Sequence, residues 1–140
     1  MARVDPYKNY NFRVEIAGIE IAGFSECTGL SSEVEIIEYR EGGDNITRKL
    51  PGLRKFGNIT LKRGMTNSRD LYNWHRNLLQ GQLDRRDGSI ILLDDTKADL
   101  ARWHFRDAFP QKYEGPRLNG RSSEVAIETL VLCCEYLELE

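Results

Sequence analysis

The stretch YNFRVEI, residues 10–16, alternates apolar with polar side chains. Because successive side chains of a β-strand point to opposite faces, this period of two predicts a strand with one buried and one solvated face. The tetrapeptide EIAG ends the stretch at residues 15–18 and occurs again at residues 20–23. Two copies at so short a spacing favour a hairpin, with a tight turn at 17–18 and a second strand over residues 19–22.

The rest of the chain predicts mostly further strands. Alternating or continuous apolar patterns of strand length occur at residues 33–40, 58–63, 87–93, 100–106 and 124–136. Asp94 and Asp95 belong to a turn between two of these strands, where aspartate is favoured because it forms local hydrogen bonds. Residues 109–116 contain two prolines and are expected to form an extended link.

One helix is predicted, over residues 68–80. Asn67 is the candidate N-cap, and Gly81 suits the left-handed position that follows a last helical turn. An apolar stripe at helical spacing is formed by Leu71, Trp74 and Leu78. Seven to eight strands with one helix, and no repeated βα units, indicate a mainly β fold: a small barrel or sandwich with one flanking helix. The length of 140 residues suits a single domain over residues 1–140.

The segment at residues 42–57 interrupts this regular pattern. It holds four glycines, one proline and four cationic side chains, and it shows little periodicity. Such a composition predicts a long loop. Because long loops in small domains are usually functional or interfacial, this segment is the first candidate contact surface.

Composition argues against several classes of function. Lys and Arg number 20 and Asp and Glu number 22, so the net charge of -2 lacks the basic excess of a general nucleic-acid binder. The apolar runs are too short for a transmembrane helix, and the first residues lack the apolar centre of a secretory signal. The three cysteines, at positions 27, 133 and 134, are expected to be free thiols in a reducing cytoplasm.

No catalytic, metal-binding or cofactor-binding residues are predicted. His75 and His104 lie far apart in the sequence without metal-ligand spacing. A packed or surface position is expected for His75, and a surface or interface position is expected for His104. Cys133 and Cys134 would point to opposite faces of a strand and could not easily bind one metal ion. The sequence contains neither a phosphate-binding glycine loop nor a nucleophile turn.

Several short motifs follow one another along the chain. They are DPYKNYNFRVEI (residues 5–16), AGFSECTGL (22–30), EYREGGDN (38–45), RKLPGL (48–53), GNITLKRG (57–64), LYNW (71–74), YEGP (113–116) and VAIETL (125–130). Together they resemble the tube proteins of contractile phage tails and of extracellular contractile injection systems, and more distantly the type VI secretion tube protein. The chain departs from the family pattern near its end, where CCEY (133–136) stands in place of a segment of the Ala-His-Glu-Gly type.

This resemblance implies a structural subunit and not an enzyme. It implies a β-barrel with a flanking helix that assembles into hexameric rings, which stack into a hollow tube inside a contractile sheath. The tube would be driven through a target envelope and would conduct an effector protein or DNA. The implied partners are further copies of the chain, the sheath protein, baseplate and terminator proteins, and the cargo, with no specific nucleic-acid recognition and no membrane insertion by the monomer. Such a tube is made in the bacterial cytoplasm as part of a phage tail or tail-like particle that can be released.

Three sets of contact residues are expected in this interpretation. The loop residues that would contact the adjacent ring are Arg48, Lys49, Leu50, Arg54 and Lys55. The candidates for lining the lumen are Arg13, Glu15 and Lys62, and the helix residues expected to face the sheath are Arg69 and Arg76. A second interpretation is a monomeric β-barrel adaptor or baseplate component of the same machine. A small-molecule-binding barrel is disfavoured, because no convergent polar pocket can be named.

Overall fold

The computed structural model describes residues 3–17, 23–43 and 45–140, so the strand predicted over residues 19–22 lies outside the described residues. The elements are β1 (Phe12–Ile16), β2 (Phe24–Thr28), β3 (Ser32–Tyr39), β4 (Arg48–Phe56), β5 (Ile59–Gly64), α1 (Asp70–Leu79), β6 (Arg86–Leu93), β7 (Asp99–Glu114), β8 (Ile127–Cys133) and β9 (Tyr136–Leu139). The mainly β fold with one helix that the sequence predicts is confirmed.

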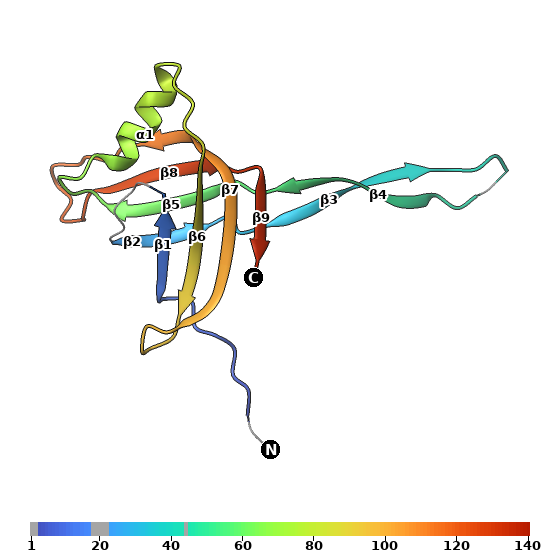
Figure 1. The fold of residues 1–140 in the computed structure, drawn as a ribbon, viewed down its shortest axis with the longest axis horizontal. Helices are drawn as coiled ribbons and strands as arrows, with labels where there is room; N and C mark the ends of the chain where they lie inside the picture. The colour runs from blue at the N-terminus through green and yellow to red at the C-terminus, as the bar shows by residue number, and fades with distance from the viewer. Residues whose placement is uncertain (1–2, 18–22, 44) are drawn as a thin grey trace.

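Most strands form two layers whose strands run in different directions and cross one another (Figure 1). Layer 1 consists of β1, β6, the first half of β7, and β9, and layer 2 consists of the second half of β7, β8, β5 and β2. All neighbouring strands in both layers are antiparallel. Strand β7 has 16 residues and belongs to both layers, so it joins them into one continuous sheet.

The hydrophobic core fills the space between the two layers. The alternation predicted for residues 10–16 places Val14 and Ile16 in this core. Layer 2 faces them with Ile59, Leu61, Leu130 and Leu132, and α1 adds Leu71 and Trp74. The apolar stripe predicted for the helix therefore does point inward, and it closes the core at the side of the second half of β7 (Figure 1).

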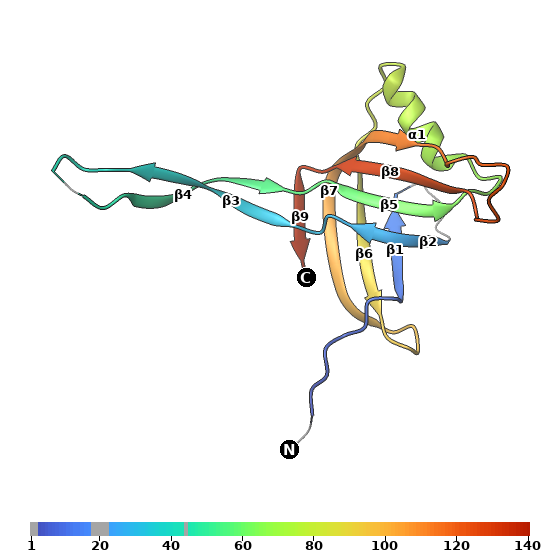
Figure 2. The same cartoon turned by 180° about the vertical axis from the view of Figure 1, so that it is seen from behind.

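The segment predicted as a loop at residues 42–57 is for the most part a strand. Residues 48–56 form β4, which pairs with β3 in a separate two-stranded sheet that projects far from the two layers (Figure 2). Pro51 is tolerated because the strand register shifts beside it. Gly52 lies against the neighbouring strand, where an added Cβ would come 3.1 Å from Ile37 Cγ1. Pro51 and Gly52 both look like strand breakers in the sequence, but here both lie within a paired strand.

Other boundaries also differ from those predicted. Residues 24–28 form β2, and β7 continues through the region predicted as an extended link. The long C-terminal strand predicted over residues 124–136 is divided into β8 and β9 by a corner at residues 134–135. Helix α1 begins at Asp70 with Arg69 at the N-cap and no side-chain cap, so the prediction of Asn67 as N-cap is wrong. Gly81 does adopt the left-handed conformation, with φ of 85°.

A buried ion pair links the central strands of layer 2. Arg63 on β5 lies opposite Glu128 on β8, and Arg63 Nε is 2.7 Å from Glu128 Oε1. The two side chains are only 4% and 2% exposed. The hydroxyl of Tyr113 on β7 donates a hydrogen bond of 2.6 Å to Glu128 Oε2. Burial and this contact with a carboxylate raise the pKa of Tyr113 to about 12.

Removal of one partner from this pair is expected to be strongly destabilising. In the Glu128→Ala variant, Arg63 stays buried without a counter-ion, which we expect to lower the free energy of unfolding by about 3–5 kcal/mol. Urea denaturation followed by tryptophan fluorescence measures the change. The matched control is Thr129→Ala on the outer face of the same strand, with an expected change within about 0.5 kcal/mol. Equal stability of the two variants would contradict a stabilising role for Glu128.

Candidate assembly surfaces

The hairpin arm, described over residues 32–43 and 45–56, exposes a series of large apolar side chains. Ile36 is 59% and Leu53 is 73% exposed, and Val34, Ile37, Tyr39 and Leu50 are also exposed. Ile36 lies opposite Pro51, and the next pair along the arm is Ile37 with Leu50. Because neighbouring positions on a strand point to opposite faces, both faces of the arm are apolar. An isolated two-stranded hairpin is marginally stable in water, so this arm needs a partner that covers both faces.

The cations predicted as loop residues are distributed along β4. Lys55 Nζ forms an ion pair of 2.7 Å with Glu35 Oε1 on β3. The hydrogen bond to Glu35 and the negative charge of Glu35 raise the pKa of Lys55. Lys49 lies opposite Glu38, and Arg54 lies opposite Val34. Among the described residues, neither Lys49 nor Arg54 forms an ion pair. Lys55 is therefore engaged within the arm, while these two cations remain available to another chain.

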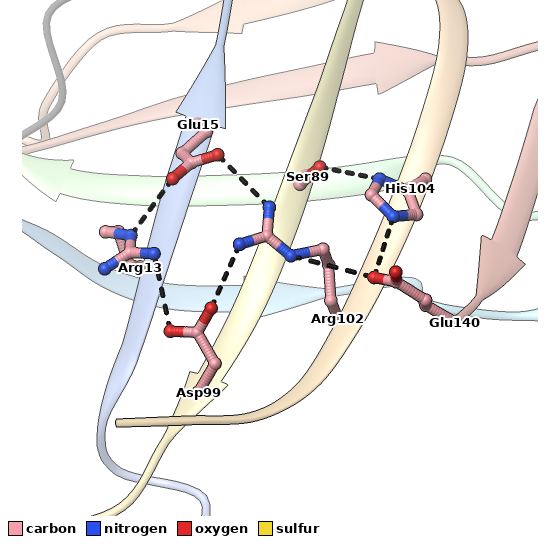
Figure 3. Close-up of polar contacts among 7 residues, drawn as sticks. All are labelled: Arg13, Glu15, Ser89, Asp99, Arg102, His104 and Glu140. Carbon is pink, nitrogen blue, oxygen red and sulfur yellow. Dashed lines mark hydrogen bonds and ion pairs between the residues drawn. The ribbon is translucent and has the colours of Figure 1, made fainter. Parts of the chain in front are cut away.

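The outer face of layer 1 carries a network of charged side chains (Figure 3). Arg13 contacts Glu15 at 3.3 Å and Asp99 at 3.5 Å. Arg102 contacts the same two carboxylates at 3.3 Å and 3.0 Å, so the four side chains form a closed ring of ion pairs. Ile91 lies between the two arginines in the strand register and is fully buried. Arg13 and Glu15 are thus held by neighbours on their own layer.

The same network continues to His104. Its Nδ1 lies 2.9 Å from Ser89 Oγ, and its Nε2 lies 3.1 Å from Glu140 Oε2 (Figure 3). Arg102 Nε is 3.8 Å from the same oxygen of Glu140. His104 is partly exposed on the polar face of β7, in line with the expected surface position, and its ring joins β6, β7 and the residue that follows β9.

The outer face of layer 2 is polar and nearly balanced in charge. Its cross-strand rows are Glu26–Lys62–Thr129–Glu114 and Thr28–Thr60–Val131–Lys112. Lys62 Nζ lies 3.5 Å from Glu26 Oε2. Lys62 points away from the core because its chain neighbours Leu61 and Arg63 are buried.

The three candidates for lining a lumen do not share a surface. Arg13 and Glu15 flank the buried Val14 and point outward from layer 1, whereas Lys62 points outward from layer 2. The core lies between the two layers, so these outer faces look in opposite directions. The three candidates therefore lie on two different faces of the protomer, and the lumen-lining role of each stays a prediction.

Helix α1 is fixed to the two layers by contacts from its inner side. Trp74 Nε1 donates to the carbonyl oxygen of Asp84 at 2.7 Å, and His75 Nδ1 lies 2.8 Å from the carbonyl oxygen of Pro110. Tyr72 packs edge-on against Tyr113, with ring centroids 5.2 Å apart. His75 is therefore a packed residue, as expected.

The cations predicted to face the sheath both lie on the exposed side of the helix. The Arg69 guanidinium donates to the carbonyl oxygens of Thr66 and Ser68, and this holds it at the beginning of α1. Arg76 is exposed in the last turn and forms no ion pair with any described residue.

Within the described residues, no cluster of His, Cys, Asp or Glu could hold a metal ion.

Asp94 lies in the turn that the sequence predicts. It accepts hydrogen bonds from the backbone of Thr96 and Ala98 and from the Thr96 hydroxyl, and these hydrogen bonds lower the pKa of Asp94. All three cysteines are free thiols, and burial raises the pKa of Cys27 to about 12. No helix among the residues described here is long and apolar enough to cross a membrane.

Comparison with known proteins gives concordant matches. The family model described as T4-like virus tail tube protein gp19 matches residues 8–138. A chain of the sheath-tube complex of the extracellular contractile injection system PVC is 28% identical, with a TM-score of 0.87 over 96% of this chain and 91% of that chain. A chain of the anti-feeding prophage cap is 29% identical, with a TM-score of 0.90 over 100% and 94%. Hcp1 from Flavobacterium johnsoniae, at 18% identity and a TM-score of 0.60 over 91% and 93%, shares the fold. No curated protein matches the sequence.

The charged network on layer 1 gives a test of its own. In the Arg102→Met variant, Glu15, Asp99 and Glu140 lose a shared cation and repel one another. We expect the free energy of unfolding at low salt to fall, because the three carboxylates then lack the cation between them. The loss should shrink as the salt concentration is raised, because dissolved ions screen the repulsion between exposed charges. Arg117→Met, which changes an exposed arginine outside the network, is the control. A loss that stays constant with salt would contradict the electrostatic role.

Proposed function

Since the chain belongs to the T4-like virus tail tube protein family, we propose that its copies form closed hexameric rings that stack into a hollow tube. The chain is a structural tube subunit of a phage tail or contractile injection system, and it is not an enzyme. The observation that carries the proposal is the hairpin arm, whose two apolar faces are uncovered in the protomer.

The arm supports stacking along the tube axis. It projects from one end of the molecule, so a neighbour beyond that end can cover its two apolar faces (Figures 1 and 2). Burial of one large apolar side chain is worth about 1.5–3 kcal/mol, and several such residues lie on each arm. Because the arm and the surface that receives it are different parts of the subunit, the contact is head-to-tail and repeats from ring to ring. Lys49 and Arg54 would then meet carboxylates of the adjacent ring.

The edges of layer 2 support ring closure. Among the described strands, β2 pairs with β5 alone, and the second half of β7 pairs with β8 alone on the opposite side of the same layer. The four strands alternate in direction, so β2 of one subunit would meet β7 of the next in antiparallel orientation. Continuous pairing around the ring would remove the exposed edges, which otherwise invite aggregation.

In this arrangement the outer face of layer 2 lines the lumen. Glu26 and Glu114 balance Lys62 and Lys112, and threonine hydroxyls fill much of the rest. A polar wall without a strong net field lets charged cargo, either an effector protein or DNA, pass without being trapped. Lys62 stays a lumen candidate, whereas Arg13 and Glu15 belong to the outside of the tube.

The outside of the tube would meet the other components of the particle. Similar chains occur in structures of a sheath-tube complex, a tube-terminating cap and a sheath/tube terminator. We propose that the charged face of layer 1 and Arg69 at the beginning of α1 lie toward the sheath, because both point away from the proposed lumen. A baseplate protein and a terminator protein would contact the two ends of the stack.

The arm's role in stacking is tested by placing charges on it. Ile37→Asp combined with Leu50→Asp changes two exposed residues that face each other across the arm. We expect the monomer to fold and rings to form but tubes to be lost, because burial of the arm in the next ring would desolvate both carboxylates. Negative-stain electron microscopy measures ring and tube formation.

Controls separate this result from failure of the proposal as a whole. Glu35→Gln combined with Lys55→Gln removes an ion pair that is formed within the same arm without introducing charge, and it should still form tubes. Tubes of normal length from the aspartate variant would refute the role of the arm. A persistent monomer from the unaltered chain would refute the tube proposal and favour the adaptor or baseplate alternative.

A further inference from the structure

Layer 1 extends beyond the open edge of β2 and leaves part of its inner face uncovered. Figures 1 and 2 both show the lower ends of β6 and β7 continuing past β2. A hollow of about 400 Å³ lies at this place. Its apolar lining consists of Phe12, Cys27, Leu30, Ile90, Leu92 and Trp103. We call it the β2 groove.

The opposite side of the molecule presents an apolar flank. Helix α1 lies beyond the second half of β7, on the side of layer 2 that is farthest from β2 (Figure 1). Its flank exposes Leu79 at 69% and Tyr72 at 38%, and Leu83 in the following connection is exposed as well. Arg76 lies beside them as an exposed cation.

The β2 groove and the α1 flank lie on opposite sides of the same layer. In a closed head-to-tail ring, opposite sides of neighbouring subunits meet. Their chemistry matches, because an apolar groove would face an apolar flank. They also continue the proposed pairing of β2 with β7 of the neighbour, because the groove lies beside β2 and α1 lies beside β7.

We propose that the β2 groove receives the α1 flank of a second copy of this chain, the adjacent subunit of the ring. Leu79 and Tyr72 of one subunit lie against Phe12 and Trp103 of the next. This inference rests on the proposed ring, and it names the surfaces by which the ring closes. It also places Arg76 at a contact between subunits, leaving Arg69 toward the sheath.

Cross-linking of assembled protein tests the contact. The background carries Cys27→Ser and Cys133→Ser, which remove the two half-buried native thiols. Ser25→Cys places a thiol at the β2 groove and Gln80→Cys places one after α1, both at exposed positions. With a short bismaleimide we expect a ladder of covalent oligomers on a denaturing gel, ending at the size of the ring.

Two matched controls define the specificity of the ladder. Each parent with a single introduced cysteine should give no ladder beyond a dimer. A second pair keeps Ser25→Cys and moves the other thiol to Arg121→Cys, in the connection between β7 and β8. That pair should remain uncross-linked, because the connection lies at the end of layer 2 and not on its α1 side (Figure 1).

A charged substitution on the flank provides a second, independent measurement. Leu79→Asp should cause loss of rings in size-exclusion chromatography while thermal unfolding of the monomer stays unchanged, because Leu79 is exposed in the protomer and burial in the groove would desolvate the carboxylate. Leu118→Asp, at a similarly exposed leucine in the connection between β7 and β8, should leave the rings intact.

The outcomes distinguish the contact from the ring itself. Rings without the cross-linked ladder, or rings from the Leu79→Asp variant, would overturn the contact and leave the tube proposal standing. Absence of rings in the cysteine-substituted background and in the unaltered chain would overturn both.

Discussion

Strand β7 determines where every other part of the molecule lies. Its first half pairs with β6 and β9, and its second half pairs with β8, so one strand holds both layers. The change of direction falls at Asp107, which has a positive φ of 54° and whose backbone N–H donates to Asp87 Oδ1 at 3.0 Å. Aspartate tolerates this conformation better than most residues because its short side chain forms local hydrogen bonds. The corner makes the layers cross, and the crossing places their outer faces on opposite sides and their free edges at different positions.

Much of this arrangement could be predicted from the sequence, and the successes share a physical cause. Strand β1, strand β5 and the inner stripe of α1 each have one buried face, so their hydrophobic pattern shows the correct period. Strand β4 could not be recognised in this way, because both of its faces are exposed in the protomer and no burial pattern exists. In the proposed tube, its apolar residues would be covered by another copy of the chain. The corner at Asp107 was also invisible, because it depends on a partner 20 positions away in sequence.

The buried ion pair left a signal that sequence reasoning could have used. On β5 the inward positions are Ile59, Leu61 and Arg63, and on β8 they are Glu128, Leu130 and Leu132. One cation and one anion thus occupy inward-facing positions of two strands. A charged side chain at a buried position needs a counter-charge nearby. Here the strand register brings the two together, and the pair also fixes that register, because a slip by one residue would turn both charges outward.

The near-balance of charge also has a local explanation. Arg13 is matched by Glu15 and Asp99, Lys62 by Glu26, Lys55 by Glu35, and Arg85 by Glu135. Most pairs are exposed and contribute little to the stability of the monomer. Their effect on assembly is larger, because each face is nearly neutral over a distance comparable to the Debye length of about 8 Å at physiological salt. Copies of one chain carry identical charges. If one face had a large net charge, the same faces of neighbouring copies in a tube would repel one another. In the proposed tube, pairing opposite charges within each face would avoid this repulsion wherever the copies meet, and the apolar arm would determine the direction of stacking.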